Sequence, residues 1–124
     1  MENKVLQLMG SRLFVVLAWV IMLSSCTSTP FRRPELNSRQ TYVDVHRHLN
    51  SSIKEAIIKG RVIKGMNFDD VRVTWGEPNE IVTSENTELL KKEEVMWQYN
   101  RLFLVPIFVY FTNRIVTEVN DDYK

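Results

Sequence analysis

The feature that most restricts the fold is an uncharged apolar run near the start of the chain, at residues 13–23. Lys4 and Arg12 precede this run, and small residues follow it directly. The run is too short for a comfortable membrane span, since a helix needs roughly twenty apolar residues to cross a bilayer. Positive charge, a short apolar core and small residues together make the layout of a secretory signal. We therefore expect residues 1–25 to be a signal peptide, and the folded domain to come from the rest.

Four residues at the end of this run, Leu23, Ser24, Ser25 and Cys26, resemble the lipobox of bacterial lipoproteins. The resemblance implies cleavage before Cys26 and acyl chains on its sulfur, because two or three chains hold a protein on a membrane durably. In such lipoproteins an Asp after the cysteine commonly retains the protein at the inner membrane. Thr27 therefore favours the outer membrane, with the domain facing the periplasm. The alternative is a buried helix or an uncleaved signal anchor with an incidental cysteine.

Cysteine and charge counts exclude several classes of function. Cys26 is the only cysteine, so neither an intramolecular disulfide nor a Cys-rich metal site can form. Removing residues 1–25 leaves fourteen of the 16 basic and fourteen of the 15 acidic residues, a net charge of zero. Nucleic-acid binding needs a concentrated positive face, which this balanced and interleaved charge does not supply. We expect no nucleic-acid partner.

The segment after the cysteine contains two prolines and several hydroxyl residues, which oppose both helix and strand pairing. We therefore interpret residues 26–36 as a lipidated tether, with a reach on the order of 30 Å when extended. Phe31, Arg32 and Arg33 could touch anionic headgroups. Two charges contribute little against screening, so a solvated linker is the simpler interpretation. The domain is then expected to cover residues 37–124.

Periodic apolar residues predict two helices at the start of this domain. Residues 37–59 carry apolar side chains at three- and four-residue steps, which places them on one helix face. This stripe consists of Tyr42, Val45, Leu49, Ile53, Ala56 and Ile57. Gly60 can end the helix in the left-handed conformation. Asn67 can cap a second helix, which Gly76 and Pro78 stop after about two turns.

Alternating and β-branched residues predict an antiparallel sheet after the helices. One strand centres on residues 95–99, and two more, 107–112 and 115–119, are separated by a two-residue turn at Asn113 and Arg114. A shorter strand at 79–83 could join them, followed by a polar loop. The expected fold class is α+β: two N-terminal helices packed on a three-stranded antiparallel sheet, in the order α-α-β-β-β.

Apolar and glycine positions from residue 60 to residue 119 make a motif. The motif positions are Gly65, Met66, Val71, Trp75, Gly76, Pro78, Trp97, Tyr99 and Phe111. With the lipobox upstream, this pattern resembles the BamE/SmpA/OmlA family of small outer-membrane lipoproteins. The resemblance implies a BamE-like arrangement of two helices on a three-stranded sheet, in which these residues are structural. It also implies an envelope location and a role in outer-membrane protein assembly or envelope integrity.

No motif predicts catalysis, a cofactor or a metal. His46 and His48 are two residues apart, which on a helix sends them to nearly opposite faces, so they could not share a metal. Asp44, His46, Ser51 and Ser52 lack the strained turn that positions the nucleophile of a catalytic triad. We expect a non-catalytic protein with no small-molecule substrate.

Two classes of function therefore stay open, with a hydrolase as a distant third. The first is a tethered interaction module that docks an envelope protein partner. The second is an envelope inhibitor or ligand-carrying module, because the expected fold resembles secreted inhibitors of β-lactam-degrading enzymes. Residues 102–111 are apolar at nearly every position. Either both sheet faces are covered, one by helices and one by the tether or a second copy, or part of this run is an exposed partner site.

Overall fold

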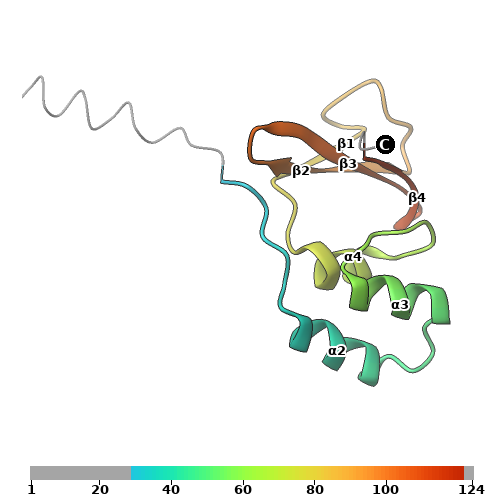
Figure 1. Ribbon diagram of the computed structural model, residues 1–124. Helices are drawn as coiled ribbons and strands as arrows, with labels where there is room; N and C mark the ends of the chain where they lie inside the picture. Colours follow the sequence, from blue (N-terminus) through green and yellow to red (C-terminus); the bar gives the residue numbers. More distant parts are fainter. Residues whose placement is uncertain (1–28, 122–124) are drawn as a thin grey trace, which may run out of the picture.

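The computed structural model describes residues 29–121 of the protein. These residues form two layers, with three short helices packed along one face of a four-stranded antiparallel sheet (Figure 1). The helices come first in the chain, and the strands follow as a meander in the spatial order β1-β2-β3-β4. The α+β class and the antiparallel sheet expected from the sequence are confirmed.

The single first helix expected over residues 37–59 is wrong, because the structure has two helices there. Helix α2 spans Leu36–Val45 and α3 spans Ser51–Lys59. Asn50 caps α3: its side-chain oxygen accepts a hydrogen bond from the Ser52 amide at 2.9 Å. A good N-cap competes with helix continuation, and this one begins a new helix. Val45, expected in the buried stripe, is instead 72% exposed.

Helices α2 and α3 are joined by an arginine that caps the end of α3. Arg39 donates from Nη1 to the carbonyl oxygens of Ile57 and Ile58, at 3.0 and 2.8 Å. Positive charge at this end complements the helix dipole and satisfies carbonyls that have no partner within the helix. Gly60 then ends α3 at φ 71°, the left-handed conformation predicted for it.

The third helix, α4, spans Phe68–Trp75 and begins with the predicted cap. The Asn67 side chain accepts from the Asp70 amide at 2.9 Å, and the Asp70 carboxylate accepts from the Asn67 amide at 3.0 Å. Asp70 is buried, and its other oxygen accepts a hydrogen bond from the Tyr42 hydroxyl at 2.8 Å. Burial, together with the Asp70 carboxylate, raises the pKa of Tyr42. The capping residues of α4 therefore also hold α2 in place.

The sheet contains one strand more than expected. Its strands are β1 Glu80–Thr83, β2 Glu94–Arg101, β3 Leu104–Thr112 and β4 Ile115–Asn120. The short segment that could have joined the sheet does so, since all four residues of β1 pair with β2. The α-α-β-β-β order is thus corrected to α-α-α-β-β-β-β.

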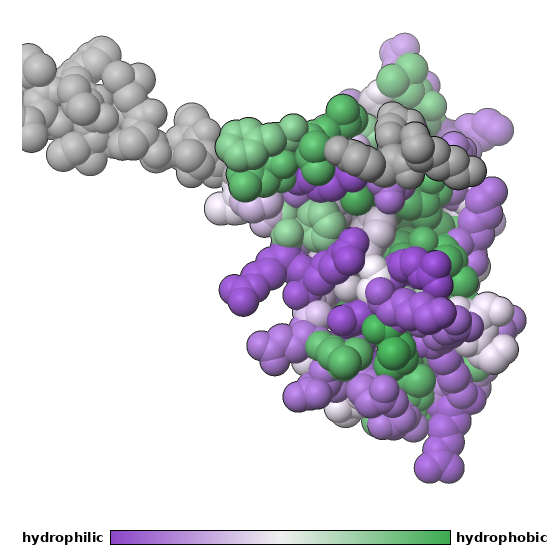
Figure 2. Space-filling view, in the orientation of Figure 1, coloured by the Kyte–Doolittle hydropathy of each residue, from purple (hydrophilic) through white to green (hydrophobic). Residues whose placement is uncertain are grey.

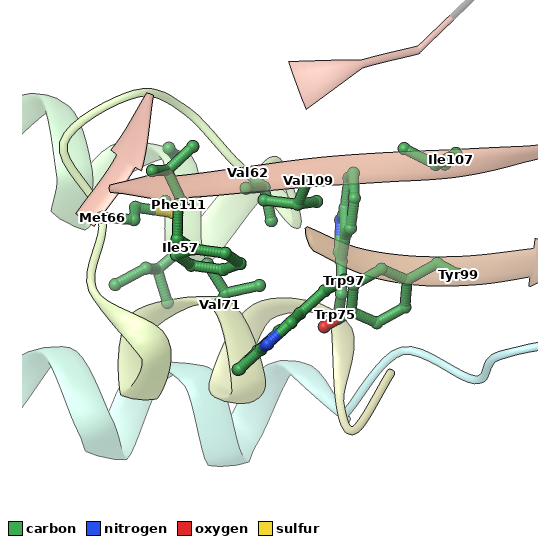
Figure 3. Close-up of a cluster of buried hydrophobic side chains, with 12 residues drawn as sticks. Ile57, Val62, Met66, Val71, Trp75, Trp97, Tyr99, Ile107, Val109 and Phe111 are labelled. Atoms are coloured by element: carbon green, nitrogen blue, oxygen red, sulfur yellow. The ribbon is translucent and has the colours of Figure 1, made fainter. Parts of the chain in front are cut away.

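The core lies between the sheet and the helices (Figure 3). Alternate residues of β2 and β3 point toward the helices, which buries Trp97, Tyr99, Val109 and Phe111. The Phe68 ring of α4 stacks on Trp97 at 4.9 Å between ring centroids and meets Phe111 edge-on at 4.7 Å. The largest apolar side chains of the sequence motif therefore share one cluster.

Backbone pairing protects the outer edge of β4. The Gly65 amide donates to the Val116 carbonyl at 2.9 Å, and the Val116 amide donates to the Met66 carbonyl at 2.8 Å. Gly65 has φ 93°, which other residues rarely adopt, so the backbone conformation here favours glycine. The connection between α3 and α4 thus covers an edge that would otherwise offer unpaired backbone groups.

Candidate functional site

The residues considered for catalysis or metal binding lie around the end of α2 and the start of α3. The prediction that His46 and His48 point apart is wrong, because α2 ends before them and their ring centroids lie 5.8 Å apart. Among the described residues, however, no three His, Cys, Asp or Glu side chains are grouped to hold a metal ion. Asp44 accepts a hydrogen bond from Gln40, and the nearest partner of the Ser51 hydroxyl is Asn50. These side chains are engaged separately, not as a triad.

Motif residues at the end of α4 connect this helix to α3 and to the sheet. The Trp75 indole donates to the Gly60 carbonyl at 2.9 Å, and the Tyr99 hydroxyl donates to the Gly76 carbonyl, also at 2.9 Å. Burial raises the pKa of Tyr99, and the negative charge of Glu77 adds to the effect. The tyrosine therefore stays a neutral donor in this position.

The segment expected to be a free tether lies against the domain from Thr29 onward. Phe31 packs against Trp75 and Tyr99, with ring centroids 5.8 and 5.2 Å away. The Phe31 amide donates to the Asn100 carbonyl at 3.0 Å, and the Asn79 side chain donates to the Thr29 carbonyl at 2.9 Å. These residues are docked at the end of β2.

Close passage of the same segment over the end of α4 depends on a glycine. A Cβ atom at Gly76 would lie 3.1 Å from the Arg32 carbonyl oxygen and 3.8 Å from the Pro34 ring. Gly76 also has φ 85°, so both its backbone and the approaching chain favour glycine. Docking of residues 29–34 is therefore part of the fold.

The most unusual surface of the domain is the tip of the β2–β3 hairpin. Four consecutive apolar residues there, Leu102, Phe103, Leu104 and Val105, are between 46% and 95% exposed, Phe103 most of all. We call these four residues the apolar tip. Figure 2 shows the hydrophobic cluster that they form beside the point where the described chain begins. Contiguous exposed apolar residues of this kind mark interaction surfaces.

Backbone geometry at the apolar tip is also unusual. Leu102 and Phe103 form a two-residue turn between Arg101 and Leu104, and Phe103 has φ 58°. Left-handed backbone favours glycine or asparagine, and a bulky side chain there costs about 1–2 kcal/mol. Arg101 braces the turn, donating from Nε and Nη2 to the Val105 carbonyl at 2.8 and 2.6 Å.

An open groove of about 550 Å³ joins the apolar tip to the docked segment. Its lining comes from both sides: Pro30, Phe31, Arg32, Arg33, Asn100, Arg101, Leu102 and Leu104. Arg32 and Arg33 are exposed at this groove, and the Arg33 guanidinium lies 6.0 Å from the centre of the Trp75 ring. The groove therefore combines apolar walls with positive charge and has no acidic lining residue.

The opposite face of the sheet is not where the tether lies. Phe31 contacts Tyr99, which points toward the helices, so the interpretation in which the tether covers the other face is wrong. That face carries Met96, Phe108 and Tyr110, all of them half-buried. The surplus of apolar residues noted in the sequence is therefore exposed mainly at the end of one hairpin.

Comparison with known proteins finds no match to this chain among family models, curated proteins or solved structures. The similarity to BamE-like lipoproteins accordingly stays a prediction from the motif. Within residues 29–121, no helix has the length and hydrophobicity needed to cross a membrane. The tetrad Leu23, Ser24, Ser25 and Cys26 lies outside the described residues.

The sequence indicates the apolar run of this surface, but it does not indicate that the docked segment lies beside it. The apolar run at 102–111 was visible, but periodicity alone could not separate its exposed end from its buried end. The sequence places Phe31 in a linker, because nothing local relates it to Trp75 and Tyr99. Arg101 carried no local signal at all, because its partner Val105 is defined only by the turn between them.

Proposed function

We propose that this chain is a lipoprotein anchored through Cys26, which acts as a non-catalytic interaction module on the periplasmic side of the outer membrane. The observation that carries the proposal is the Leu23-Ser24-Ser25-Cys26 tetrad, placed after a short apolar run with basic residues before it. The single cysteine then serves as the attachment point, and the domain needs no other thiol chemistry.

The docked segment supports this proposal by setting the distance between anchor and domain. Thr29 is hydrogen-bonded to the domain, and it follows Cys26 by only three residues. Three residues reach at most about 11 Å when fully extended. A domain on so short a link meets partners at the membrane surface, not far out in the periplasm.

A BamE-like role in outer-membrane protein assembly or envelope integrity is the finer form of the proposal. The motif residues support it, because Met66, Val71, Trp75, Trp97 and Phe111 occupy the core where structural residues of a family would lie. The partner would be an envelope protein that approaches the same membrane.

The anchor is tested by labelling living bacteria with a palmitate analogue and comparing the natural chain with Cys26→Ala. We expect label on the natural chain and none on the variant, since the sulfur is the only acylation site proposed. Ser28→Ala, which leaves the tetrad intact, is the matched control and should label normally. Equal label in both chains, or an intact mass with the leader attached and no added hydrocarbon, would refute the anchor.

The interaction role is tested by crosslinking in intact cells, followed by affinity purification of the full chain from solubilised envelope. We expect to recover one discrete envelope protein, in an amount that follows the amount of the purified chain. A monomeric, abundant chain with no crosslinked partner would contradict the proposal. Recovery of an inactive hydrolase would support the inhibitor alternative instead.

A further inference from the structure

We infer that the apolar tip of the β2–β3 hairpin inserts into the surface of the membrane that carries the anchor, and so fixes the orientation of the domain. The inference deepens the proposed function and rests on its membrane anchor. It assigns the four tip residues a ligand of defined chemistry, the boundary between phospholipid headgroups and acyl chains. The domain would then be held at two points, the lipid on Cys26 and the hairpin.

The first described residues lie beside the hairpin that carries the apolar tip. Residues 1–28 precede Thr29, whose carbonyl is bound by Asn79, and the Phe31 amide is bound by Asn100 at the base of the same hairpin. Any anchor on Cys26 is therefore close to the apolar tip. In Figure 1 the described chain begins beside this hairpin and far from the turn between β3 and β4.

The side chains of the apolar tip are themselves suited to an acyl boundary. Four adjacent apolar side chains with exposed fractions up to 95% are unfavourable in water and favourable at an acyl boundary. Phe103 keeps φ 58°, where glycine or asparagine would fit without strain. Backbone strain of this kind clusters at functional sites, and at Phe103 it coincides with an exposed apolar turn.

Positive charge lies next to the apolar tip. Arg32 and Arg33 line the groove next to Leu102 and Leu104, and the groove has no acidic lining residue. Arg32 is exposed there and would meet headgroup phosphates, while the Arg33 guanidinium lies over the Trp75 ring. Arg101 is engaged by Asp121 and by the Val105 carbonyl, so it holds the hairpin in shape.

Membrane depth at single positions tests the inference directly. Phe103→Cys introduces a thiol at the tip, and Leu89→Cys is the matched control, because Leu89 is also apolar and 91% exposed but lies in the loop between β1 and β2. Each full-length chain is purified from membranes, labelled with an environment-sensitive dye and reconstituted into phosphatidylethanolamine and phosphatidylglycerol vesicles containing acyl-chain spin-labelled lipid. The quencher reports dye that lies about 5–10 Å deep, at the acyl boundary.

We expect quenching to be about threefold stronger at position 103 than at position 89, with a blue-shifted emission only at 103. Equal quenching at the two positions would overturn the inference. Shielding of the dye at 103 without acyl-chain quenching would also overturn it, and would indicate a protein partner or a second copy. Leu102→Cys provides a second tip position if the Phe103 variant does not fold.

The same experiment separates this inference from the anchor on which it rests. The parent chain has no thiol other than Cys26, so dye on the parent would mean that this sulfur is free and the proposed lipidation is wrong. An unlabelled parent with no quenching at position 103 would leave the anchor intact and refute tip insertion alone.

Discussion

The two hairpins that share strand β3 have turn residues of opposite polarity. The turn between β3 and β4 consists of Asn113 and Arg114, both polar and both at positive φ, at 51° and 68°. Positive φ at both positions matches the twist of a tight two-residue hairpin, and asparagine tolerates it well, while Arg114 carries left-handed strain of the kind found at Phe103. The turn between β2 and β3 places Leu102 and Phe103 in the corresponding positions, with Phe103 at φ 58°.

The two turns therefore differ in what they expose: polar side chains at Asn113 and Arg114, and apolar side chains at Leu102 and Phe103. Both hairpins use the same buried face of β3, so the core supports them equally. Only the β2–β3 turn combines apolar residues, backbone strain and nearness to the start of the described chain. The turn for which we propose a membrane contact therefore lies at the opposite end of β3 from the polar turn.

The largest effect is expected from a substitution in the core, which both hairpins share. Trp97→Ala empties a site that is 1% exposed and packed against Phe68 and Phe111. We expect a loss of about 3–5 kcal/mol in the free energy of unfolding, most of what a small domain has. Circular dichroism of the full chain in detergent during denaturant titration measures it. Gln98→Ala, on the other sheet face, is the control. A loss under about 1 kcal/mol would show that the core does not unite the hairpins.

The second-largest effect is expected at the turn between β3 and β4. Asn113→Val puts a β-branched residue at φ 51°, which should lower the free energy of unfolding by about 1–2 kcal/mol. Asn113→Gly should be nearly neutral, because glycine adopts this conformation freely. The same titration measures both variants. Equal stability of the valine and glycine variants would mean that this turn tolerates strain as the other does.

At the apolar tip we expect a substitution to raise the free energy of unfolding and not to lower it. Phe103→Gly relieves the left-handed strain and should raise the free energy of unfolding by about 0.5–1 kcal/mol, less than the full strain because glycine gains freedom in the unfolded chain. Thermal unfolding followed by circular dichroism would register a rise of several degrees. Phe103→Leu keeps the strain and should show no gain. Destabilisation by glycine would mean that Phe103 contributes to folding and not to an external contact.

The smallest effect concerns the ion pair beside the tip. Arg101 Nη1 lies 3.2 Å from Asp121 Oδ1, and the Asp121 side chain is 47% exposed. Asp121→Asn should cost about 0.2–1 kcal/mol at low salt and almost nothing at high salt, since partly exposed pairs are screened. Arg101 keeps its bonds to the Val105 carbonyl in the variant. A larger loss that does not depend on salt would show that this pair, and not the core, sets the hairpin geometry.

Signals confined to a few neighbouring residues predicted the fold well. The Asn67 cap, the glycine ends of α3 and α4 and the Asn113-Arg114 turn each depend on local backbone chemistry. The break after Val45 was missed because the apolar period continues across it, and periodicity outweighed the capping residue Asn50. The contact between Tyr42 and Asp70 was missed because nothing local relates positions 28 residues apart.

By itself, the sequence determined the α+β class, most element ends and the presence of an unexplained apolar run, because each of these depends on side chains close together in the chain. Only the tertiary structure decided which part of that run is exposed and what lies next to it. Phe31 reaches Tyr99 and Asn100 across about seventy residues of chain, and that contact places the first described residues beside the apolar tip. Such proximity follows from how the sheet and helices close around one core, which no local pattern encodes.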